Sequence, residues 1–352
     1  MFERLHLGYY LLLVLTATAM AAGLAFGEVN LSRFLSPGGI KRLILSASVF
    51  PLMWITAVAV AITRRQVDWP AATLLRMIRS RKRWLLRGTF FFVVIVAFAR
   101  CFSSFKIAIP VLNPFWADPL LAELDHRTFG TDAWVLTHSV LGDFGTLVID
   151  RIYILWFVVV ALTSGWICFA RDPKLQIRGL MCYVLSWTIL GGATALGLSS
   201  VGPCFYEEFY GSQRFTPLMD KLGAISVQQE IMAFRTMNFL IGSLDKDYIG
   251  GGISAMPSLH VAMALLSFLC VYCYTNSKVL KVVSSLFGIA ILIGSVHLGW
   301  HYAWDGIISI IGVTIFWWAT GRYVDWLEAR ELQQSKASQP AIVSVTALPA
   351  TP

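Results

Sequence analysis

The chain has 352 residues, of which 57% are hydrophobic and only 14% are charged, and it carries a formal net charge of +8. Soluble domains contain about 25% charged residues, so this composition excludes a soluble globular protein and predicts a polytopic membrane protein. The basic excess does not indicate a nucleic-acid partner, because such a site needs aromatic residues interleaved with basic ones on a folded soluble surface.

Eight stretches are apolar enough to cross a bilayer, which takes about 20 residues of helix. They cover residues 8–27, 43–63, 88–111, 148–170, 179–200, 257–275, 279–298 and 302–321. The predicted fold class is therefore all-α, a membrane bundle of about eight transmembrane helices. Arg100 and Lys106 fall within the third stretch, and each must either reach the membrane surface or face a polar cavity.

Basic residues are concentrated between the second and third spans, at positions 64, 65, 76, 79, 81, 82, 83 and 87. The positive-inside rule places this loop in the cytoplasm together with both termini. The sixth and eighth spans then begin at the extracytoplasmic face. Short loops favour a bacterial inner membrane, with that face toward the periplasm.

Two connections are longer than the others. Residues 112–147 predict an amphipathic helix lying at the outer interface. Residues 201–253 predict a lid or binding element, and the glycines at 250–252 give this segment backbone freedom at its end. The cytoplasmic tail, residues 323–352, ends in a Gln-, Ser-, Ala- and Pro-rich stretch that is typical of disorder.

A first motif, Ser-Ala-Met-Pro-Ser-Leu-His at 254–260, stands at the outer end of the sixth span. Pro257 is predicted to open this helix, because its missing N–H costs nothing there. The free amides of the first turn, with the hydroxyls of Ser254 and Ser258, would form an anion site. His260 is then placed to donate a proton to a leaving oxygen, work that suits the ordinary pKa of imidazole.

A second motif, His-Tyr-Ala-Trp-Asp at 301–305, stands at the outer end of the eighth span. His301 and Asp305 are four residues apart and thus predicted to share a helical face, where the carboxylate fixes the imidazole tautomer and leaves the other ring nitrogen free to attack. Ionisable groups at the head of apolar spans predict function. The alternative is a non-catalytic transporter or a metal or haem carrier that uses His297 and His301, with Asp305 and His260 as further ligands.

The segments Gly-Gly-Ile-Ser-Ala-Met-Pro-Ser-Leu-His (251–260) and His-Leu-Gly-Trp-His-Tyr-Ala-Trp-Asp (297–305) resemble the second and third signature motifs of the type 2 phosphatidic acid phosphatase superfamily. The inositol phosphorylceramide synthase-like branch is the closer match. The resemblance implies a six-helix catalytic core at residues 88–322. The pattern of hydropathy and charge predicts that a two-helix membrane segment with a basic cytoplasmic loop, residues 1–87, precedes it. It also implies that His301 forms a phosphohistidine, Asp305 orients it and His260 protonates the leaving group, with no metal or cofactor.

Two departures from the family pattern affect phosphate binding. Ser295 stands where the third motif has an arginine, six residues before its histidine, and Val201-Gly-Pro stands where the first motif, a lysine followed seven residues later by Arg-Pro, is expected. Other cations must then meet the phosphate charge. The candidates on the outer side are Arg100, Lys106, Arg127, Arg151, Arg214 and Arg235. The predicted phosphate ligands are Ser254, Ser258, Arg127, Arg214 and Arg235.

A further segment around Asp125, Arg127, Phe129 and Gly130 also resembles the synthase-like branch. Together these features predict an integral-membrane lipid phosphatase or phosphotransferase whose substrate is a membrane lipid phosphate. Water would complete a hydrolysis, whereas a polyol such as inositol would make the protein a head-group phosphotransferase. The sequence leaves both readings open, along with the identity of the lipid and the oligomeric state.

Overall fold

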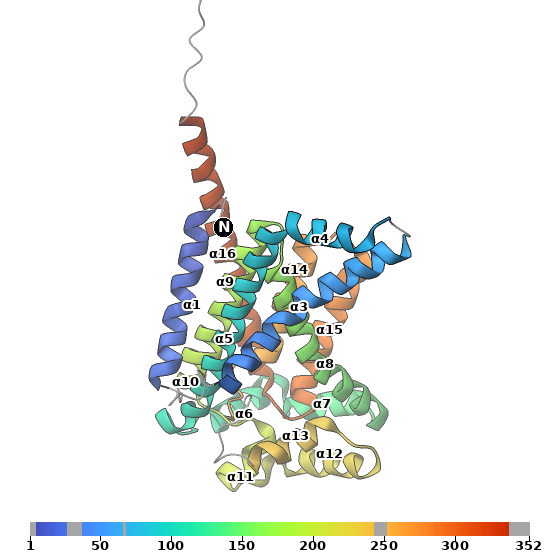
Figure 1. Ribbon diagram of the computed structural model, residues 1–352. Helices are drawn as coiled ribbons and strands as arrows, with labels where there is room; N and C mark the ends of the chain where they lie inside the picture. Colours follow the sequence, from blue (N-terminus) through green and yellow to red (C-terminus); the bar gives the residue numbers. More distant parts are fainter. Residues whose placement is uncertain (1–4, 27–36, 66–67, 243–251, 338–352) are drawn as a thin grey trace, which may run out of the picture.

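The computed structural model describes residues 5–26, 37–65, 68–242 and 252–337, and the secondary structure within these ranges is entirely helical (Figure 1). The long helices pack into one bundle. They are α1 (His6–Phe26), α3 (Pro37–Arg64), α5 (Lys82–Leu112), α8 (Asp143–Cys168), α9 (Pro173–Leu185), α14 (Leu259–Tyr274), α15 (Lys278–His297) and α16 (Ala303–Ala337).

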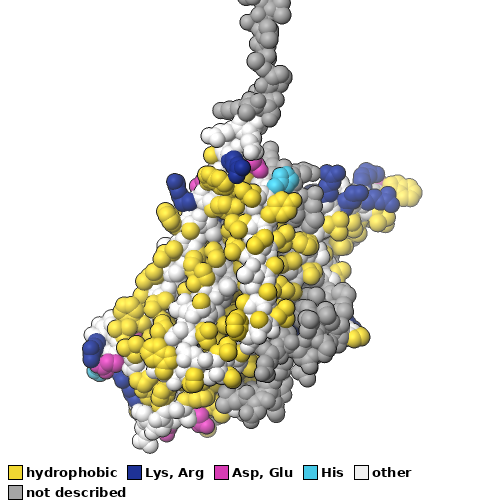
Figure 2. All heavy atoms as spheres, turned by 90° about the vertical axis from the view of Figure 1, so that its left-hand side faces the viewer, with side chains coloured by type: hydrophobic (Ala, Val, Ile, Leu, Met, Phe, Trp, Pro, Cys, Tyr) yellow, Lys and Arg dark blue, Asp and Glu magenta, His cyan; other side chains and the backbone are white. Residues whose placement is uncertain are grey.

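Six helices of the described residues are long and apolar enough to cross a membrane: α1, α5, α8, α9 with its continuation to Gly197, α15 and α16. The helices α3 and α14 contribute shorter apolar stretches, Ser48–Arg64 and Leu259–Tyr274. Hydrophobic side chains cover the middle of the face seen in Figure 2, and charged side chains gather toward its two ends. The predicted helical membrane bundle is therefore confirmed, while the number of eight spans stays a prediction.

The two ends of the bundle differ in kind (Figure 1). One end carries the N-terminus, the end of α16 and the basic helix α4 (Pro70–Ser80). The other end carries short helices: α6 (Asp118–Phe129), α7 (Ala133–Val140), α10 (Ala195–Gly197), α11 (Tyr206–Tyr210), α12 (Thr216–Gln228) and α13 (Met232–Ile241). The 3₁₀ turns Pro203–Phe205 and Gln213–Phe215 lie among them in the chain.

Several predicted boundaries need correction. The single amphipathic helix expected over residues 112–147 is instead two helices, because Gly130 takes a left-handed conformation with φ 75° and ends α6. The helix α14 begins at Leu259 rather than at Pro257, since Ser258 is its N-cap. The helix α16 continues to Ala337, past the predicted end of the eighth span and into the tail at 323–352, so residues 323–337 of the tail predicted to be disordered are helical. Residues 250 and 251 of the glycine run lie outside the described residues.

The helix α9 changes character halfway, passing into a π-helical segment at Ser186–Thr194. Gly191 in this segment lies close to two other helices, because a Cβ there would come within 2.8 Å of side-chain atoms of Phe102 on α5 and Leu259 on α14. π-Helical turns inside α-helices are frequent at functional sites. The absence of a side chain at Gly191 lets three helices meet where the cavity described next is found.

Candidate active site

A cavity of about 510 Å³ opens where α5, α8, the π-helical segment, α13 and α14 converge. Most of its wall is apolar and aromatic, formed among others by Phe102, Tyr153, Trp156, Phe157, Trp187, Phe205, Phe239 and Trp300. The polar part of the wall includes Lys106, Ser254, His260 and His301. Both histidines selected from the sequence thus face one cavity, with apolar surface beside them.

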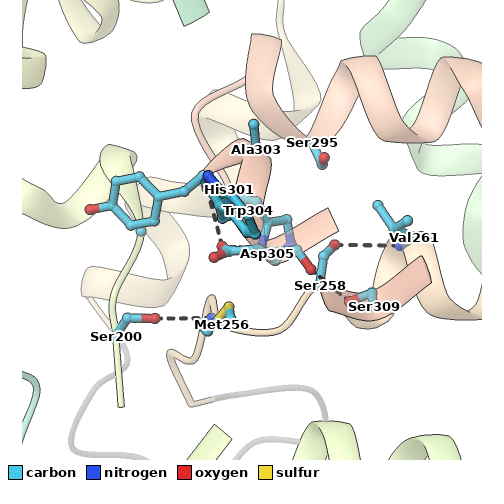
Figure 3. Close-up of polar contacts among 12 residues, drawn as sticks. Ser200, Met256, Ser258, Val261, Ser295, His301, Ala303, Trp304, Asp305 and Ser309 are labelled. Carbon is cyan, nitrogen blue, oxygen red and sulfur yellow. Dashed lines mark hydrogen bonds and ion pairs between the residues drawn. The ribbon is translucent and has the colours of Figure 1, made fainter. Parts of the chain in front are cut away.

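His301 and Asp305 are in direct contact (Figure 3). The Nδ1 atom of His301 lies 3.2 Å from Oδ2 of Asp305, and the same oxygen accepts a hydrogen bond from the Tyr302 amide at 3.1 Å. The side chain of Asp305 is fully buried and that of His301 nearly so. With Nδ1 protonated and donating to the carboxylate, Nε2 of His301 is left free for chemistry.

The reason for this contact differs from the one predicted. His301 is not on a helical face, because α16 begins two residues later at Ala303. It lies in a turn whose backbone is fixed from another helix, since the His301 amide donates to the carbonyl of Ser295 at 2.9 Å. The carboxylate reaches back from the first turn of α16 to meet the imidazole.

His260 lies across from His301, with ring centroids 5.8 Å apart. Its ring stacks on Tyr153 of α8 at 4.7 Å and an interplanar angle of 21°, and its ring centroid is 4.3 Å from that of Trp156. The Trp156 indole also donates to the His260 carbonyl at 2.9 Å. One face of α8 therefore fixes both the backbone and the ring of His260, which is needed for a side chain that must hold one position during proton transfer.

Ser254 and Ser258 have different places. Ser254 lines the cavity. Ser258 is fully buried and caps α14, because its Oγ accepts from the Val261 amide at 3.4 Å and its own amide donates to the Asp305 carbonyl at 3.2 Å (Figure 3). The contact between Ser258 and Asp305 joins the two motifs, so the serine predicted as a phosphate ligand instead fixes the starts of α14 and α16 relative to each other.

The helix α6 holds the start of α16 through Asp125. Its Oδ2 accepts from the Ala303 amide at 2.8 Å and its Oδ1 from the Trp304 amide at 3.2 Å, so a carboxylate from a distant segment caps this helix. Burial raises the pKa of Asp125 to about 6, although the two amide hydrogen bonds act in the opposite direction. Asp125 therefore positions the turn that carries His301.

A second buried carboxylate of α6, Asp118, organises the loop before α11. Its oxygens accept from the amides of Val201 and Gly202, the latter at 2.8 Å, and from the hydroxyls of Tyr210 and Tyr302 at 3.0 Å each. Burial raises the pKa of Asp118, and these four donors oppose the shift. The sequence reasoning did not select Asp118; its only signal was an acidic residue among apolar neighbours.

The loop at residues 199–204 connects the parts of the site. The Ser200 hydroxyl accepts from the Met256 amide at 2.9 Å (Figure 3). The Ser200 backbone carbonyl accepts from the Ala255 amide at 2.9 Å, and the two bonds fix the first motif. Gly202 has φ 88°, and a Cβ there would lie 2.5 Å from the Trp300 carbonyl oxygen. A glycine is required at this position, and the segment that departs from the family's first motif is thus a packing element against both motifs.

The three arginines predicted as phosphate ligands are not on the cavity wall. Arg127 pairs with Glu123 at 2.7 Å and its side chain is 75% exposed. Arg235 pairs with Glu230 at 3.0 Å and is 70% exposed. Both stand on short helices at the end of the bundle, and each is paired with a carboxylate instead of lining the cavity.

Arg214 is also engaged elsewhere, since its guanidinium contacts the Asp132 carboxylate at 2.5 Å and the Ala122 carbonyl at 3.0 Å. The pKa of Arg214 is raised by the hydrogen bond to Asp132. Of the six candidate cations, Lys106 on α5 is the one that lines the cavity. A lysine within an apolar span had to find a polar environment, and the cavity supplies it.

His297, the remaining histidine of the second motif, is held away from His301 by its own partners. Its Nε2 lies 2.9 Å from the Thr146 hydroxyl and its Nδ1 lies 3.1 Å from the Thr137 hydroxyl. Its ring stacks on His138 at 3.8 Å. Within the described residues, no three His, Cys, Asp or Glu side chains are grouped as metal ligands. Both ring nitrogens of His297 are thus used in joining α15 to α7 and α8.

Comparison with known protein families identifies the family to which this chain belongs. A family model described as the PAP2 superfamily matches residues 122–319, which is more than half of the chain and includes His260, His301 and Asp305. No curated protein matches the chain, and neither does any solved structure. The family and the long apolar helices fit an integral membrane protein with a phosphatase-like function. The chain belongs to the PAP2 superfamily, the type 2 phosphatidic acid phosphatases.

Proposed function

We propose that this protein is an integral-membrane phosphatase or phosphotransferase that acts on a lipid phosphate through a phosphohistidine at His301. The observation that carries the proposal is the arrangement of His301 on a cavity wall, with the buried Asp305 carboxylate 3.2 Å from its Nδ1 and the His260 ring 5.8 Å away. This is a nucleophile with an orienting acid and a separate proton donor.

In the first step, Nε2 of His301 attacks phosphorus and the bond from phosphorus to the lipid oxygen breaks. The imidazole then carries a positive charge, which the Asp305 carboxylate stabilises from the Nδ1 side. The protonated ring of His260 gives its proton to the leaving oxygen, so the lipid departs as an alcohol. Lys106 contributes a positive charge to the wall that faces the phosphate.

In the second step, an oxygen nucleophile attacks the phosphohistidine and His260 removes its proton, which returns both histidines to their starting state. Water as the nucleophile gives a phosphatase. A hydroxyl of another alcohol gives a phosphotransferase, with a polyol such as inositol as one possible acceptor, which would leave as its phosphate ester. The resemblance to the inositol phosphorylceramide synthase-like branch favours transfer to a hydroxyl. Both reactions use the same residues up to the intermediate.

The shape of the cavity supports a lipid substrate. The polar groups around His260 and His301 adjoin a larger aromatic and aliphatic surface from α5, α8 and α13, including Phe102, Phe157 and Phe239. A phosphate bound at the histidines would place an attached apolar chain on this surface, where its burial is favourable. A small soluble phosphate ester would leave that surface without a partner.

The proposed orientation puts the site on the extracytoplasmic side of a bacterial inner membrane. It is supported by the basic helix α4, which lies with the N-terminus at the end of the bundle opposite to α6 and the start of α16 (Figure 1). We further propose residues 88–322 as the catalytic core, with residues 1–87 as an N-terminal two-helix membrane segment that carries a basic cytoplasmic loop, and the chain after 322 on the cytoplasmic side. A non-catalytic metal or haem carrier built on His297 is less well supported, because threonine hydroxyls lie beside both of its ring nitrogens.

The experiment is phosphate release by the purified protein in detergent from a panel of lipid phosphates, with a metal chelator present. His301→Ala is expected to abolish release, and His6→Ala, an exposed histidine of α1, is expected to retain it. Equal rates for the wild type and His301→Ala would refute the proposal. If the wild type releases no phosphate, transfer to inositol or glycerol is measured with the same variants, and silence there as well would favour the non-catalytic reading.

A further inference from the structure

Tyr153 on α8 presents a polar group that the fold leaves unused. The residue is only 5% exposed and lines the cavity together with both histidines. Its hydroxyl oxygen is buried and has no hydrogen-bond partner in the part of the chain that the structure describes. A buried hydroxyl without a partner destabilises the fold, so its presence at a cavity wall indicates that a bound ligand accepts its hydrogen bond.

The ring of Tyr153 is held in place from two sides. One face stacks on the His260 imidazole at 4.7 Å. Its edge packs on α15, where a Cβ at Gly294 would lie 3.0 Å from Cδ2 of the tyrosine. Because the ring is fixed in this way, the Tyr153 hydroxyl cannot readily move to reach a hydrogen-bond partner elsewhere in the protein.

Ser295, the neighbour of Gly294, does not supply the phosphate-binding cation that the family motif has at this position. Ser295 stands where the third family motif has an arginine, but its own hydroxyl donates to the Leu292 carbonyl and its carbonyl accepts from the His301 amide at 2.9 Å. Ser295 thus supports the backbone of the His301 turn and directs no donor at a substrate. The tyrosine packs against the residue next to it.

A second unpartnered donor belongs to Trp300, the residue before His301. The Nε1 atom of Trp300 is buried without a hydrogen-bond partner among the described residues, and Trp300 also lines the cavity. Two residues with unpartnered neutral donors, a hydroxyl and an indole N–H, therefore line the same cavity as the proposed nucleophile. Oxygens of a phosphoryl group are acceptors of the kind that such donors lack.

We propose that Tyr153 and Trp300 donate hydrogen bonds to the oxygens of the phosphoryl group bound at His301, in the role that a cation at position 295 would otherwise fill. The proposal rests on the proposed function, since it assigns a ligand to the same cavity. It explains how a site with Lys106 as its lining cation can hold a phosphate: neutral donors supply the remaining contacts.

The test uses Tyr153→Phe, which removes the hydroxyl and keeps the ring that supports His260. A hydrogen bond to a charged group contributes about 1.5–3 kcal/mol, which corresponds to about a 10- to 100-fold loss in affinity for inorganic phosphate. Affinity is measured on the full chain in detergent by phosphate-dependent protection against thermal unfolding, which needs no turnover. The control is Tyr183→Phe, a buried tyrosine of α9 outside the cavity wall, which is expected to keep the wild-type affinity.

The outcomes separate the two proposals. Loss of phosphate protection in Tyr153→Phe, with unfolding in the absence of phosphate at the wild-type temperature or higher, supports the inference, because removing an unpartnered hydroxyl does not harm the fold. Equal protection of wild type and Tyr153→Phe overturns the inference and leaves the proposed function standing. Slower turnover with unchanged phosphate affinity also overturns it, since the hydroxyl then acts on the histidines. If the wild type shows no protection and no phosphate-releasing or transfer activity, the proposed function fails and the inference with it.

Discussion

The negative charge of Asp305 is expected to be essential to catalysis, even though asparagine, a neutral residue of the same shape, can occupy the position. Attack by Nε2 turns the His301 imidazole into a cation, and the carboxylate oxygen lies 3.2 Å from Nδ1 of that ring. With an effective dielectric constant of about 20, two unit charges 3.2 Å apart attract by about 5 kcal/mol. Asp305→Asn removes this attraction, so the rate of phosphohistidine formation is expected to fall about 10³- to 10⁴-fold.

The substitution suits the structure of the site. The asparagine oxygen can still accept from the Tyr302 amide and from Nδ1 of His301, as Oδ2 of Asp305 does now. The new amide group would occupy the place of Oδ1 of Asp305, which has no hydrogen-bond partner within the described residues. The fold is therefore expected to persist, and the unfolding temperature of the variant serves as the check.

The assay follows the phosphoenzyme itself. Protein incubated with a lipid phosphate labelled in its phosphoryl group is quenched at increasing times, and alkali-stable, acid-labile label on the protein is counted. Asp220→Asn, an exposed aspartate of α12, is the matched control and is expected to label within about twofold of the wild-type rate. A labelling rate for Asp305→Asn above one-tenth of the wild type would refute the electrostatic reasoning.

Three further predictions concern phosphate binding and the support of the site. Lys106→Met is expected to lower kcat/KM for lipid phosphate about 10- to 100-fold, because a charged donor is lost from the cavity wall. The control Lys278→Met, at the exposed start of α15, is expected to leave kcat/KM unchanged. Equal effects of the two substitutions would contradict a role of Lys106 in phosphate binding. The pKa of Asp125 is raised to about 6, above its ordinary value of 3.8, so its stabilising contribution is complete below pH 3.8 and is lost as the pH rises through 6. The unfolding temperature of Asp125→Asn is therefore expected to fall less than that of the wild type between pH 4 and 7, and parallel profiles would show that this carboxyl does not carry the shift. Gly202→Ala is expected to lower both the unfolding temperature and the activity, because the new Cβ would lie 2.5 Å from the Trp300 carbonyl oxygen. The φ of 88° at this position also costs residues other than glycine about 1–3 kcal/mol. Wild-type stability and activity would mean that the loop at residues 199–204 can move aside.

Hydropathy and motif spacing were sufficient to predict the class of protein and to select the two histidines that line the cavity. An apolar span must form its hydrogen bonds within itself, so each long hydrophobic stretch predicts a helix without knowledge of its neighbours. Free-energy cost also singles out His260, His301 and Asp305, because ionisable groups at the ends of apolar spans are unfavourable and usually indicate a functional site. His260 and His301 line one cavity and Asp305 contacts His301, while the catalytic roles of the three residues stay predictions.

The choice among the cations was beyond sequence reasoning. Each of Arg127, Arg214 and Arg235 is paired with a carboxylate, that of Glu123, Asp132 and Glu230 respectively. Lys106 instead reaches the cavity, from a helix that precedes the family match. Charge and position along the chain do not distinguish a paired cation from a free one. That distinction depends on which side chains the packing brings within a few ångströms.

The support of the site was decided by tertiary structure for the same reason. Asp125 caps a helix that starts 178 residues later in the chain, and Asp118 binds the Tyr302 hydroxyl across 184 residues. No local periodicity records such pairs, because each partner satisfies its hydrogen bonds only when both segments are folded. The sequence alone therefore determined the membrane-spanning helices and the chemical groups at their ends. Only the packing decided where His301 is held, which cation faces it and which buried donors are left for a ligand, since these depend on contacts between residues far apart in the chain.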